Sequence, residues 1–525
     1  MELTKKMIHT SSIKPCMSMQ TTLDDDFNVP DSKADVERLI TTRGEIEITE
    51  VEALTDKIRV AGACHFYVLY TTNQEQYPIS SLEGSIPLEQ IINCDGTKPI
   101  DTVKVKAVLE DLNISIINSR KLSIRCLINL HSFVGDTRDY EAAAAFSPQL
   151  PTKMEPMEPD MQCLYKDVTM TTLKVNKKDI FRVKEEIKIP SGKAPIYEIL
   201  WSETTLSNME TRLMDGKLLL NGELSMFLLY QTLEESMPIQ FFEMDLPIKG
   251  ELPVEDVTES MLDCVEVKIA STNYTIRPNE EGEDRIFEVE CTLDLDIRIY
   301  EEESMQLLSD IYSPNAECKV EPLTFPYVKL LQKNQAKTRI SQKMKLKDAK
   351  DSILQIAHIN GTVKLDALTP VKDGVNAEGV VTADILYASG SDAHPFNSTF
   401  VMVPFSYLVE MDGMKETDQY EIVPHLDQIS INMIDSDEVE LKAVLSLSAI
   451  AFTPLQATLI KDVLVSPLDA EKMQKMPGMV GYVVKPGDTL WSIAKTYYTT
   501  KDNIVRCNEL ENEMIEAGDK LIIVK

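Results

Sequence analysis

The sequence predicts a mainly β protein with three repeated antiparallel β-sandwich-like domains, followed by a small α/β module of the order strand, helix, helix, strand. A glycine and, eight residues later, a tyrosine recur three times, at spacings of 160 and then 157 residues. Apolar and polar residues alternate over long stretches of each unit, as they do in strands that bury one face. The recurring residues are Gly62, Gly222 and Gly379, and Tyr70, Tyr230 and Tyr387.

Each stretch from glycine to tyrosine is expected to form one strand. A glycine inside a strand is typical of a bulge or a close backbone approach, and a tyrosine at its end is typical of packing with a bonded hydroxyl. Two prolines follow each tyrosine. They predict a hairpin loop and then an edge strand, because proline cannot donate to a central ladder. These prolines are Pro78, Pro238 and Pro395, and then Pro87, Pro247 and Pro404.

The second half of each unit also recurs. An Asp-x-Val/Ile-x-Val/Ile pattern begins at Asp101, Asp263 and Asp427. A long alternating strand then ends each unit, and residues 287–300 are the clearest example, with strict alternation that predicts one dry and one wet face. The pattern therefore predicts β structure through most of the repeat.

Domain boundaries are predicted where the composition shifts. Residues 147–160 hold four prolines and no periodicity, which is typical of a linker. Short helical turns are predicted at 35–40 and 196–200. We expect the repeats to fold as separate units. The predicted units are repeats at 1–138, 161–309 and 318–460, linkers at 139–160 and 461–481, and the terminal module at 482–525. A further linker is predicted near residues 310–317.

The terminal module contains residues that are typical of helix starts and of turns. Asp488 or Thr489 can cap a first helix, and Thr499 or Thr500 can cap a second. A turn at residues 518–519 then leads into a second strand. The first helix has one apolar face at i, i+3, i+4 and i+7, which predicts core positions. These positions are Leu490, Ile493, Ala494 and Tyr497.

The composition limits the cellular compartments and the classes of partner that are expected for this chain. The chain has 525 residues, a formal net charge of −32 and 43% hydrophobic residues. A surface with this much negative charge repels nucleic acid and anionic lipid. The charge suits a basic partner or serves only solubility. The first twenty residues lack the apolar core of a secretory signal, and no run of 18 apolar residues could span a membrane. The nine cysteines show no paired spacing. We therefore expect a cytosolic protein with buried free thiols.

The sequence offers little for catalysis. Six scattered histidines have no paired spacing, and phosphate-loop, GxSxG and calcium-loop patterns are absent. Acidic clusters such as Asp24-Asp25-Asp26 are expected to be solvated faces. We expect no catalytic residue, no metal site and no cofactor, and we expect the chain not to be an enzyme.

The segment 482–525 resembles a LysM module. The resemblance rests on Tyr482, the run from Gly487 to Trp491, Ile493-Ala494, Asn508, Gly518 and Leu521. LysM modules typically bind N-acetylglucosamine polymers in a shallow groove between two loops, and some bind protein instead. Carried over by position, the resemblance implies a binding groove. Its residues are Gly487, Asp488, Thr489 and Leu490, and Glu511, Asn512, Glu513, Met514 and Ile515.

The three-unit region is similar to the SPOCS domain family of spore-coat assembly proteins. The similarity rests on the Phe27–Pro30 entry, on Asp31-Ser32 and Asp35-Val36, on the strand from glycine to tyrosine, and on the prolines that follow. The combination with LysM implies a non-enzymatic scaffold in the mother-cell cytoplasm, at the forespore surface. Its LysM module would bind a stage IV sporulation protein A-like coat ATPase, and other coat proteins are further possible partners.

A second function remains open at this point. The same LysM resemblance also fits a protein that binds peptidoglycan, an N-acetylglucosamine glycan of cortex or cell wall. The sequence alone does not decide between protein and glycan as the ligand. It implies neither a nucleic-acid partner nor a membrane span.

Overall fold

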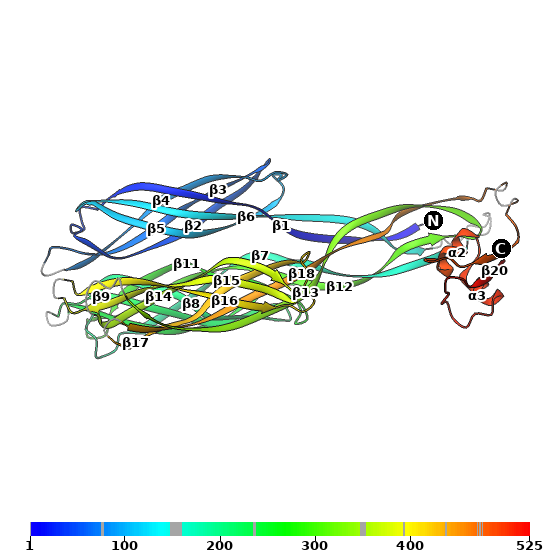
Figure 1. The fold of residues 1–525 in the computed structure, drawn as a ribbon. Helices are drawn as coiled ribbons and strands as arrows, with labels where there is room; N and C mark the ends of the chain where they lie inside the picture. The colour runs from blue at the N-terminus through cyan, green and yellow to red at the C-terminus, as the bar shows by residue number, and fades with distance from the viewer. Residues whose placement is uncertain are drawn as a thin grey trace.

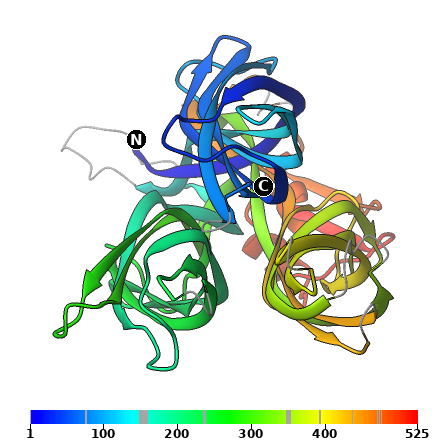
Figure 2. The same ribbon diagram turned by 90° about the vertical axis from the view of Figure 1, so that its left-hand side faces the viewer.

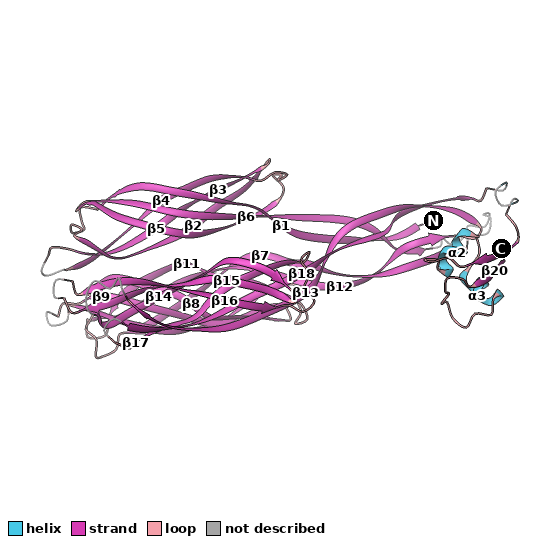
Figure 3. Ribbon diagram, in the orientation of Figure 1, coloured by secondary structure: helices cyan, strands magenta, loops and turns pink. Residues whose placement is uncertain are grey.

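The computed structural model describes residues 2–524 apart from 75–77, 148–159, 235–237, 347–352, 392–393, 436–437, 470, 472–473 and 475. The molecule is elongated: three β repeats lie together at one end, and the terminal module lies at the other, close to both chain termini (Figure 1). Seen along its length, the three repeats surround a common centre (Figure 2). Almost all regular structure is strand, and the labelled helices belong to the terminal module (Figure 3).

Each repeat contains two three-stranded antiparallel sheets. The first and last two strands of a repeat form one sheet, with the last strand in the centre, and the three strands between them form a meander. In the first repeat the strands are β1 (Glu2–Asn28), β2 (Arg38–Leu54), β3 (Lys57–Thr71), β4 (Ile79–Asn93), β5 (Thr102–Asn118) and β6 (Lys121–Ser147).

The second and third repeats follow the same order and nearly the same strand lengths. The second has β7 (Gln162–Lys188), β8 (Glu198–Met214), β9 (Lys217–Gln231), β10 (Ile239–Pro253), β11 (Leu262–Pro278) and β12 (Asp284–Tyr312). The third has β13 (Ala316–Lys345), β14 (Ile353–Val371), β15 (Gly374–Ser389), β16 (Phe396–Glu410), β17 (Gln419–Met433) and β18 (Glu438–Pro467). The predicted fold class is confirmed.

The recurring glycines lie where a bulged neighbouring strand comes closest. Each is the sixth residue of β3, β9 or β15, opposite a register shift in β2, β8 or β14. A Cβ at Gly62 would lie 2.0 Å from the carbonyl oxygen of Glu47, and one at Gly379 would lie 2.1 Å from that of Lys364. The predicted bulge and the predicted close approach are both present. A side chain at these positions would clash with the neighbouring strand, so glycine is needed there.

The recurring tyrosines and prolines also have the predicted places. Tyr70, Tyr230 and Tyr387 are fully buried, and the hydroxyls of Tyr70 and Tyr230 donate to the carbonyls of Ala34 and Ala194 at 3.0 and 3.2 Å. The second set of prolines lies within β4, β10 and β16, which are edge strands of their sheets. A missing N–H is tolerated there because no further strand needs it.

Every repeat has a hydrophobic core between its two sheets. In the first repeat it includes Phe66, Val68 and Tyr70 from β3 and Ile124 and Ile128 from β6. The alternation of buried and exposed residues along each strand follows the sequence pattern. Burial of one face of both sheets is the main force that holds each repeat together.

The first and last strands of each repeat run on beyond the sandwich and pair as long two-stranded ribbons (Figure 1). The three ribbons share one apolar cluster. It contains Ile8 and Ala142 from the first repeat, Val168, Met170, Met305 and Leu307 from the second, and Phe325, Ala457 and Leu459 from the third. The three repeats are therefore joined through a common core in addition to their own.

Charged groups also join the repeats. The ammonium of Lys106 lies 3.2 Å from Glu266 and 3.3 Å from Glu421, so that one lysine of the first repeat contacts carboxylates of both others. Arg298 of the second repeat lies 2.8 Å from the same Glu421. Burial alone would raise the pKa of Glu266, but Lys106 and two further lysines hold it down, at about 2.

Several predictions are corrected by the structure. Residues 35–40 and 196–200 form no helical turn: they lead into β2 and β8. The aspartates of the Asp-x-Val pattern are not in register, since Asp101 precedes β5, Asp263 is second in β11 and Asp427 is ninth in β17. Strand β6 continues through residues 139–147 and β18 through 461–467, where linkers are predicted; residues 148–159 lie outside the described residues.

The cysteines follow the prediction in part. Cys64, Cys126 and Cys291 are buried free thiols, and Cys163, Cys264, Cys318 and Cys507 are also free. Cys94 is disulfide-bonded, which the prediction of free thiols did not foresee. Burial raises the pKa of the Cys291 thiol, which keeps it protonated and poorly nucleophilic.

Candidate binding site

The terminal module has the predicted order of elements. β19 (Met479–Val483) pairs antiparallel with β20 (Lys520–Val524), and α2 (Leu490–Thr496) and α3 (Lys501–Cys507) lie between them in the chain. Thr489 caps α2 in a reciprocal capping box with Ser492, and Thr500 caps α3 through the backbone N–H of Asn503. Of the paired alternatives that the sequence offered for each cap, Thr489 and Thr500 are the residues used.

The predicted apolar face of α2 forms the core of the module. Leu490, Ile493 and Ala494 are buried, and Tyr497 packs against the same cluster at its edge. Leu490 is therefore a core residue, although it also belongs to the first predicted groove loop. Ile515, from the second loop, packs against this cluster too, so each loop contributes one residue to the core of the module.

The first loop is rigidly held. Gly487 has a φ of +88°, which glycine adopts without strain. The Asp488 carboxylate accepts from the Tyr482 hydroxyl at 2.7 Å and from the Lys485 backbone N–H at 2.8 Å. The bond with Tyr482 lowers the pKa of Asp488. Asp488 thus closes a turn in addition to lining the loop, while the side chain of Thr489 remains exposed.

The second loop projects into solvent. Glu511, Asn512 and Glu513 are exposed, and Met514 is 84% exposed. The Asn512 side-chain oxygen accepts from the Met514 backbone N–H at 2.9 Å, which fixes the turn. Glu513 lies 2.7 Å from Lys501 of α3. Met514 therefore stands out as a large apolar side chain held in solvent by an ordered turn.

Comparisons with known families match part of each repeat and the terminal module. The family described as "SipL, SPOCS domain" matches residues 35–117, 195–277 and 352–434, and the family described as "LysM domain" matches residues 482–524. The chain is a SPOCS-repeat protein with a LysM domain. No curated protein and no solved structure matches it. The three SPOCS matches each begin near the entry to the meander and end at or next to the end of β5, β11 and β17.

The LysM domain of this SPOCS-repeat protein is docked on the end of the second repeat's ribbon. The indole N–H of Trp491 donates to Asp310 at 2.7 Å, and the Lys495 ammonium lies 2.6 Å from the other oxygen of that carboxylate. Tyr312 meets Trp491 edge to face, with ring centroids 4.8 Å apart, and its hydroxyl donates to the Thr499 carbonyl at 3.0 Å. Burial raises the pKa of this hydroxyl to about 12, so it remains a donor.

This contact was not predicted, because the sequence predicts a linker near residues 310–317. In the structure β12 continues to Tyr312 and β13 begins at Ala316. The face that docks is the α2 face with Trp491 and Lys495 at i and i+4. Its only sequence signal is an exposed aromatic beside a lysine on a short helix. The docking leaves the loop residues Thr489 and 511–514 exposed.

Among the described residues, no group of three or more His, Cys, Asp or Glu side chains is placed to hold a metal ion. In the same part of the chain, no helix is long and apolar enough to cross a membrane. SPOCS and LysM domains are binding or scaffold domains, and the LysM domain therefore presents a candidate binding site.

Proposed function

We propose that this chain is a non-enzymatic scaffold of spore-coat morphogenesis. Its LysM domain binds a stage IV sporulation protein A-like coat ATPase, and the chain thereby attaches coat around the forespore. The SPOCS repeats connect the chain to a sporulation family, and the LysM domain supplies a binding module. The chain acts in the mother-cell cytoplasm, at the surface of the forespore.

One observation carries the proposal: the LysM domain is held at the far end of the ribbons (Figure 1), and Thr489 and residues 511–514 of its two loops are exposed. The contacts of Asp310 with Trp491 and Lys495 fix its orientation. A module fixed in this way meets a large surface with less loss of freedom than one on a flexible tether. An exposed methionine such as Met514 suits an adaptable protein contact.

A second candidate is binding to peptidoglycan. It is favoured by the LysM match itself, since LysM modules typically bind N-acetylglucosamine polymers. In this case the same loops would hold sugar rings, and the chain would act at cortex or wall.

The two functions are separated by a binding experiment with the full chain. We expect an immobilised stage IV sporulation protein A-like ATPase to retain the purified full chain. It should not retain a chain that ends at residue 481. Purified peptidoglycan should not sediment either protein. If peptidoglycan sediments the full chain and the ATPase is not retained, the scaffold proposal fails and the glycan proposal stands.

A further inference from the structure

Around the centre of the molecule, the three repeats meet through three equivalent contacts. Tyr67, Phe227 and Asp384 are each the eleventh residue of β3, β9 and β15. The thirteenth residues of β3, β9 and β15 are Leu69, Leu229 and Leu386. Their partners on β2, β8 and β14, each directly after a register shift, are Thr41, Trp201 and His358. Each contact can therefore be compared with the other two, position by position.

Aromatic and charged side chains fill two of these contacts. Between the second and third repeats, Phe227 stacks on His358 with ring centroids 4.1 Å apart, and both imidazole nitrogens bond Glu203 and Glu243 at 3.1 and 2.6 Å. Between the first and second repeats, the Arg43 guanidinium lies over the rings of Tyr67 and Trp201, at 4.6 and 5.5 Å from their centroids.

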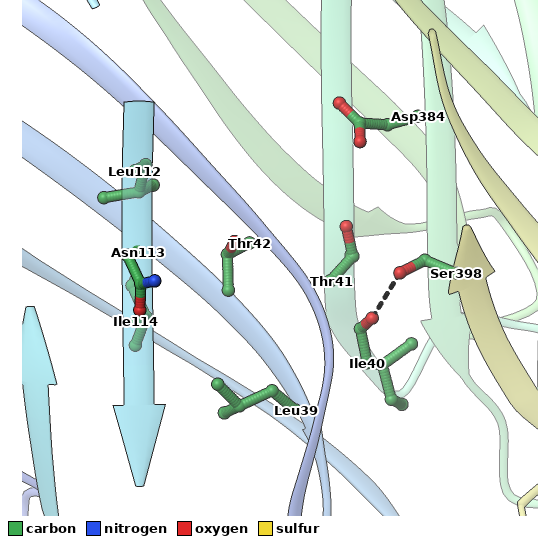
Figure 4. A pocket seen from close by; sticks show the side chains of 9 residues that line it. All are labelled: Leu39, Ile40, Thr41, Thr42, Leu112, Asn113, Ile114, Asp384 and Ser398. Carbon is green, nitrogen blue, oxygen red and sulfur yellow. Dashed lines mark hydrogen bonds between the residues drawn. The ribbon is translucent and has the colours of Figure 1, made fainter. Parts of the chain in front are cut away.

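The third contact, between the third and first repeats, has Asp384 where the others have Phe227 and Tyr67. It has Thr41 where the others have His358 and Trp201. Two small polar residues thus replace two rings, and a hollow of about 340 Å³ is left between the repeats. Figure 4 shows Asp384 on one side of this hollow and Leu112, Asn113 and Ile114 of β5 on the other.

The hollow carries one charge. Of the nine described residues that line it, Asp384 alone is ionisable, and the structure gives its carboxylate no hydrogen bond or ion pair. The cations of the flanking strands have other partners: Arg38 bonds Asn397 and the Phe396 carbonyl, and Lys364 bonds Glu110. Ser398 donates to the Ile40 carbonyl and is likewise engaged.

Asp384 is exposed and the hollow is largely open to solvent, but the neighbouring protein partly desolvates the carboxylate. This partial desolvation, with the negative Glu203 nearby, raises the pKa of Asp384 to about 6. A carboxylate in such a place gains from a cation, because the cation restores the interaction that water no longer supplies.

We propose that this hollow binds a primary ammonium group on a short aliphatic chain. The ammonium would bond Asp384 and the hydroxyl of Thr41, and the methylenes would lie against Leu112 and Ile114 of β5. The volume lies at the lower end of the range for ligand pockets, which fits a ligand of this size. Such a group comes from a free alkylamine or from a lysine side chain of a partner protein.

The test uses the full chain and isothermal titration with pentylamine at pH 7.5. We expect a dissociation constant on the order of 1 mM, which is ordinary for so small a ligand. Pentanol, which has the same chain and no charge, should bind at least about tenfold more weakly because it lacks the charge-assisted bond. Equal binding of the two probes would overturn the proposal.

Two variants locate the site. Asp384→Asn keeps the shape and removes the charge, so pentylamine affinity should fall by about tenfold or more. Asp366→Asn removes the same charge from an exposed position of β14 and should leave the affinity unchanged. A folded Asp384→Asn that still binds pentylamine normally would overturn the proposal, as would an absence of binding to the unmodified chain.

A filling variant provides an independent check. Asp384→Phe introduces the residue that the second repeat has at this position, and its ring should fill the hollow. It should therefore abolish pentylamine binding and leave the circular dichroism spectrum unchanged. Unchanged binding in that variant would contradict the assignment. Titration with Nα-acetyl-lysine methylamide separates the sources: binding as tight as that of pentylamine supports a partner's lysine, and selective binding of pentylamine supports a free amine.

Discussion

Asp310 makes two polar contacts that hold the LysM domain in place, next to those of Tyr312. It accepts from the indole of Trp491 and pairs with Lys495, and both bonds lie in a partly buried contact. We expect Asp310→Ala to release the domain, because hydrogen bonds of this charged kind contribute about 1.5 to 3 kcal/mol each. Hydrogen–deuterium exchange in α2 should rise while exchange in β3 and β9 stays the same.

The matched control is Glu317→Ala, which removes an exposed carboxylate from the start of β13, in the same region. It should leave exchange in α2 unchanged. If Asp310→Ala also leaves it unchanged, the docking of the LysM domain does not depend on this residue.

His358 makes the contact between the second and third repeats sensitive to pH. Burial alone would lower its pKa, but the bonds to Glu203 and Glu243 outweigh that effect and raise it. A histidine with a raised pKa contributes stability that is complete below its unfolded pKa of about 6.5 and is lost as the pH rises through the folded pKa.

We therefore expect His358→Gln to reduce the free energy of unfolding more at pH 6 than at pH 9. At pH 6 the loss should approach the roughly 3 to 5 kcal/mol that follows removal of one partner of a buried ion pair. Urea unfolding of both proteins at the two pH values measures it. The same loss at pH 6 and pH 9 would show that the charge on His358 does not matter.

At the scale of the elements, the repeated glycines differ in what a methyl group would meet. Gly62 faces a backbone carbonyl at 2.0 Å, whereas Gly222 faces the sulfur of Met209, a flexible side chain. We expect Gly62→Ala to cost about 1 to 3 kcal/mol of unfolding free energy, as overpacking does, and Gly222→Ala to cost less.

Gly478→Ala is the control, since nothing lies within 4 Å of a Cβ there. Thermal unfolding of the three variants compares them. Suppose that Gly62→Ala and Gly222→Ala lose the same unfolding free energy. The close approach of the backbone would then not explain why glycine recurs at this position.

The elements also explain which parts of the fold could be predicted. Gly62 and Tyr70 have equivalents at fixed distances because each serves the geometry of its own strand, and such local requirements are visible in sequence. The aspartates Asp101, Asp263 and Asp427 misled, because a period of two matches an alternating strand at many offsets. Short helical turns failed at 35–40, where the chain enters β2 instead.

The candidate site could also be predicted in part from the sequence. The caps, core and loops of the LysM domain follow from local pattern, so Thr489, Leu490 and the exposed turn at Met514 could be placed. The contact with Asp310 and Tyr312 could not, because it joins residues about 180 positions apart and leaves no periodic signal. The role of the groove loops in binding stays a prediction.

At the scale of the whole molecule, the repeats are joined more tightly than separate units would be. Their ribbons share one core, and Lys106 contacts carboxylates of two other repeats. The starts of the two predicted linkers at 139–160 and 461–481 lie within β6 and β18, whereas the idea that each repeat folds alone stays a prediction. The amine site proposed between the third and first repeats depends on this arrangement, since neither repeat forms it alone.

We expect a chain that is cut between residues 148 and 159 to remain one particle. A protease site placed there should yield two fragments that elute together under native conditions and separate in denaturant, because the shared ribbon core spans the cut. Multi-angle light scattering of the cut protein measures this. Separate elution of the two fragments without denaturant would contradict the interlocked arrangement.

We propose that the exposed loops of the LysM domain bind the coat ATPase. The most direct measurement is the affinity of the full chain for that protein by surface plasmon resonance, with Met514→Asp as the variant. We expect a loss of about 1 to 3 kcal/mol in binding free energy, as for a significant interface residue, and an unchanged circular dichroism spectrum. Met479→Asp is the matched control: Met479 is 65% exposed on β19, outside both loops, and should bind normally. Normal affinity in a folded Met514→Asp, Asn512→Ala double variant would contradict the claim and place the interface elsewhere on the chain.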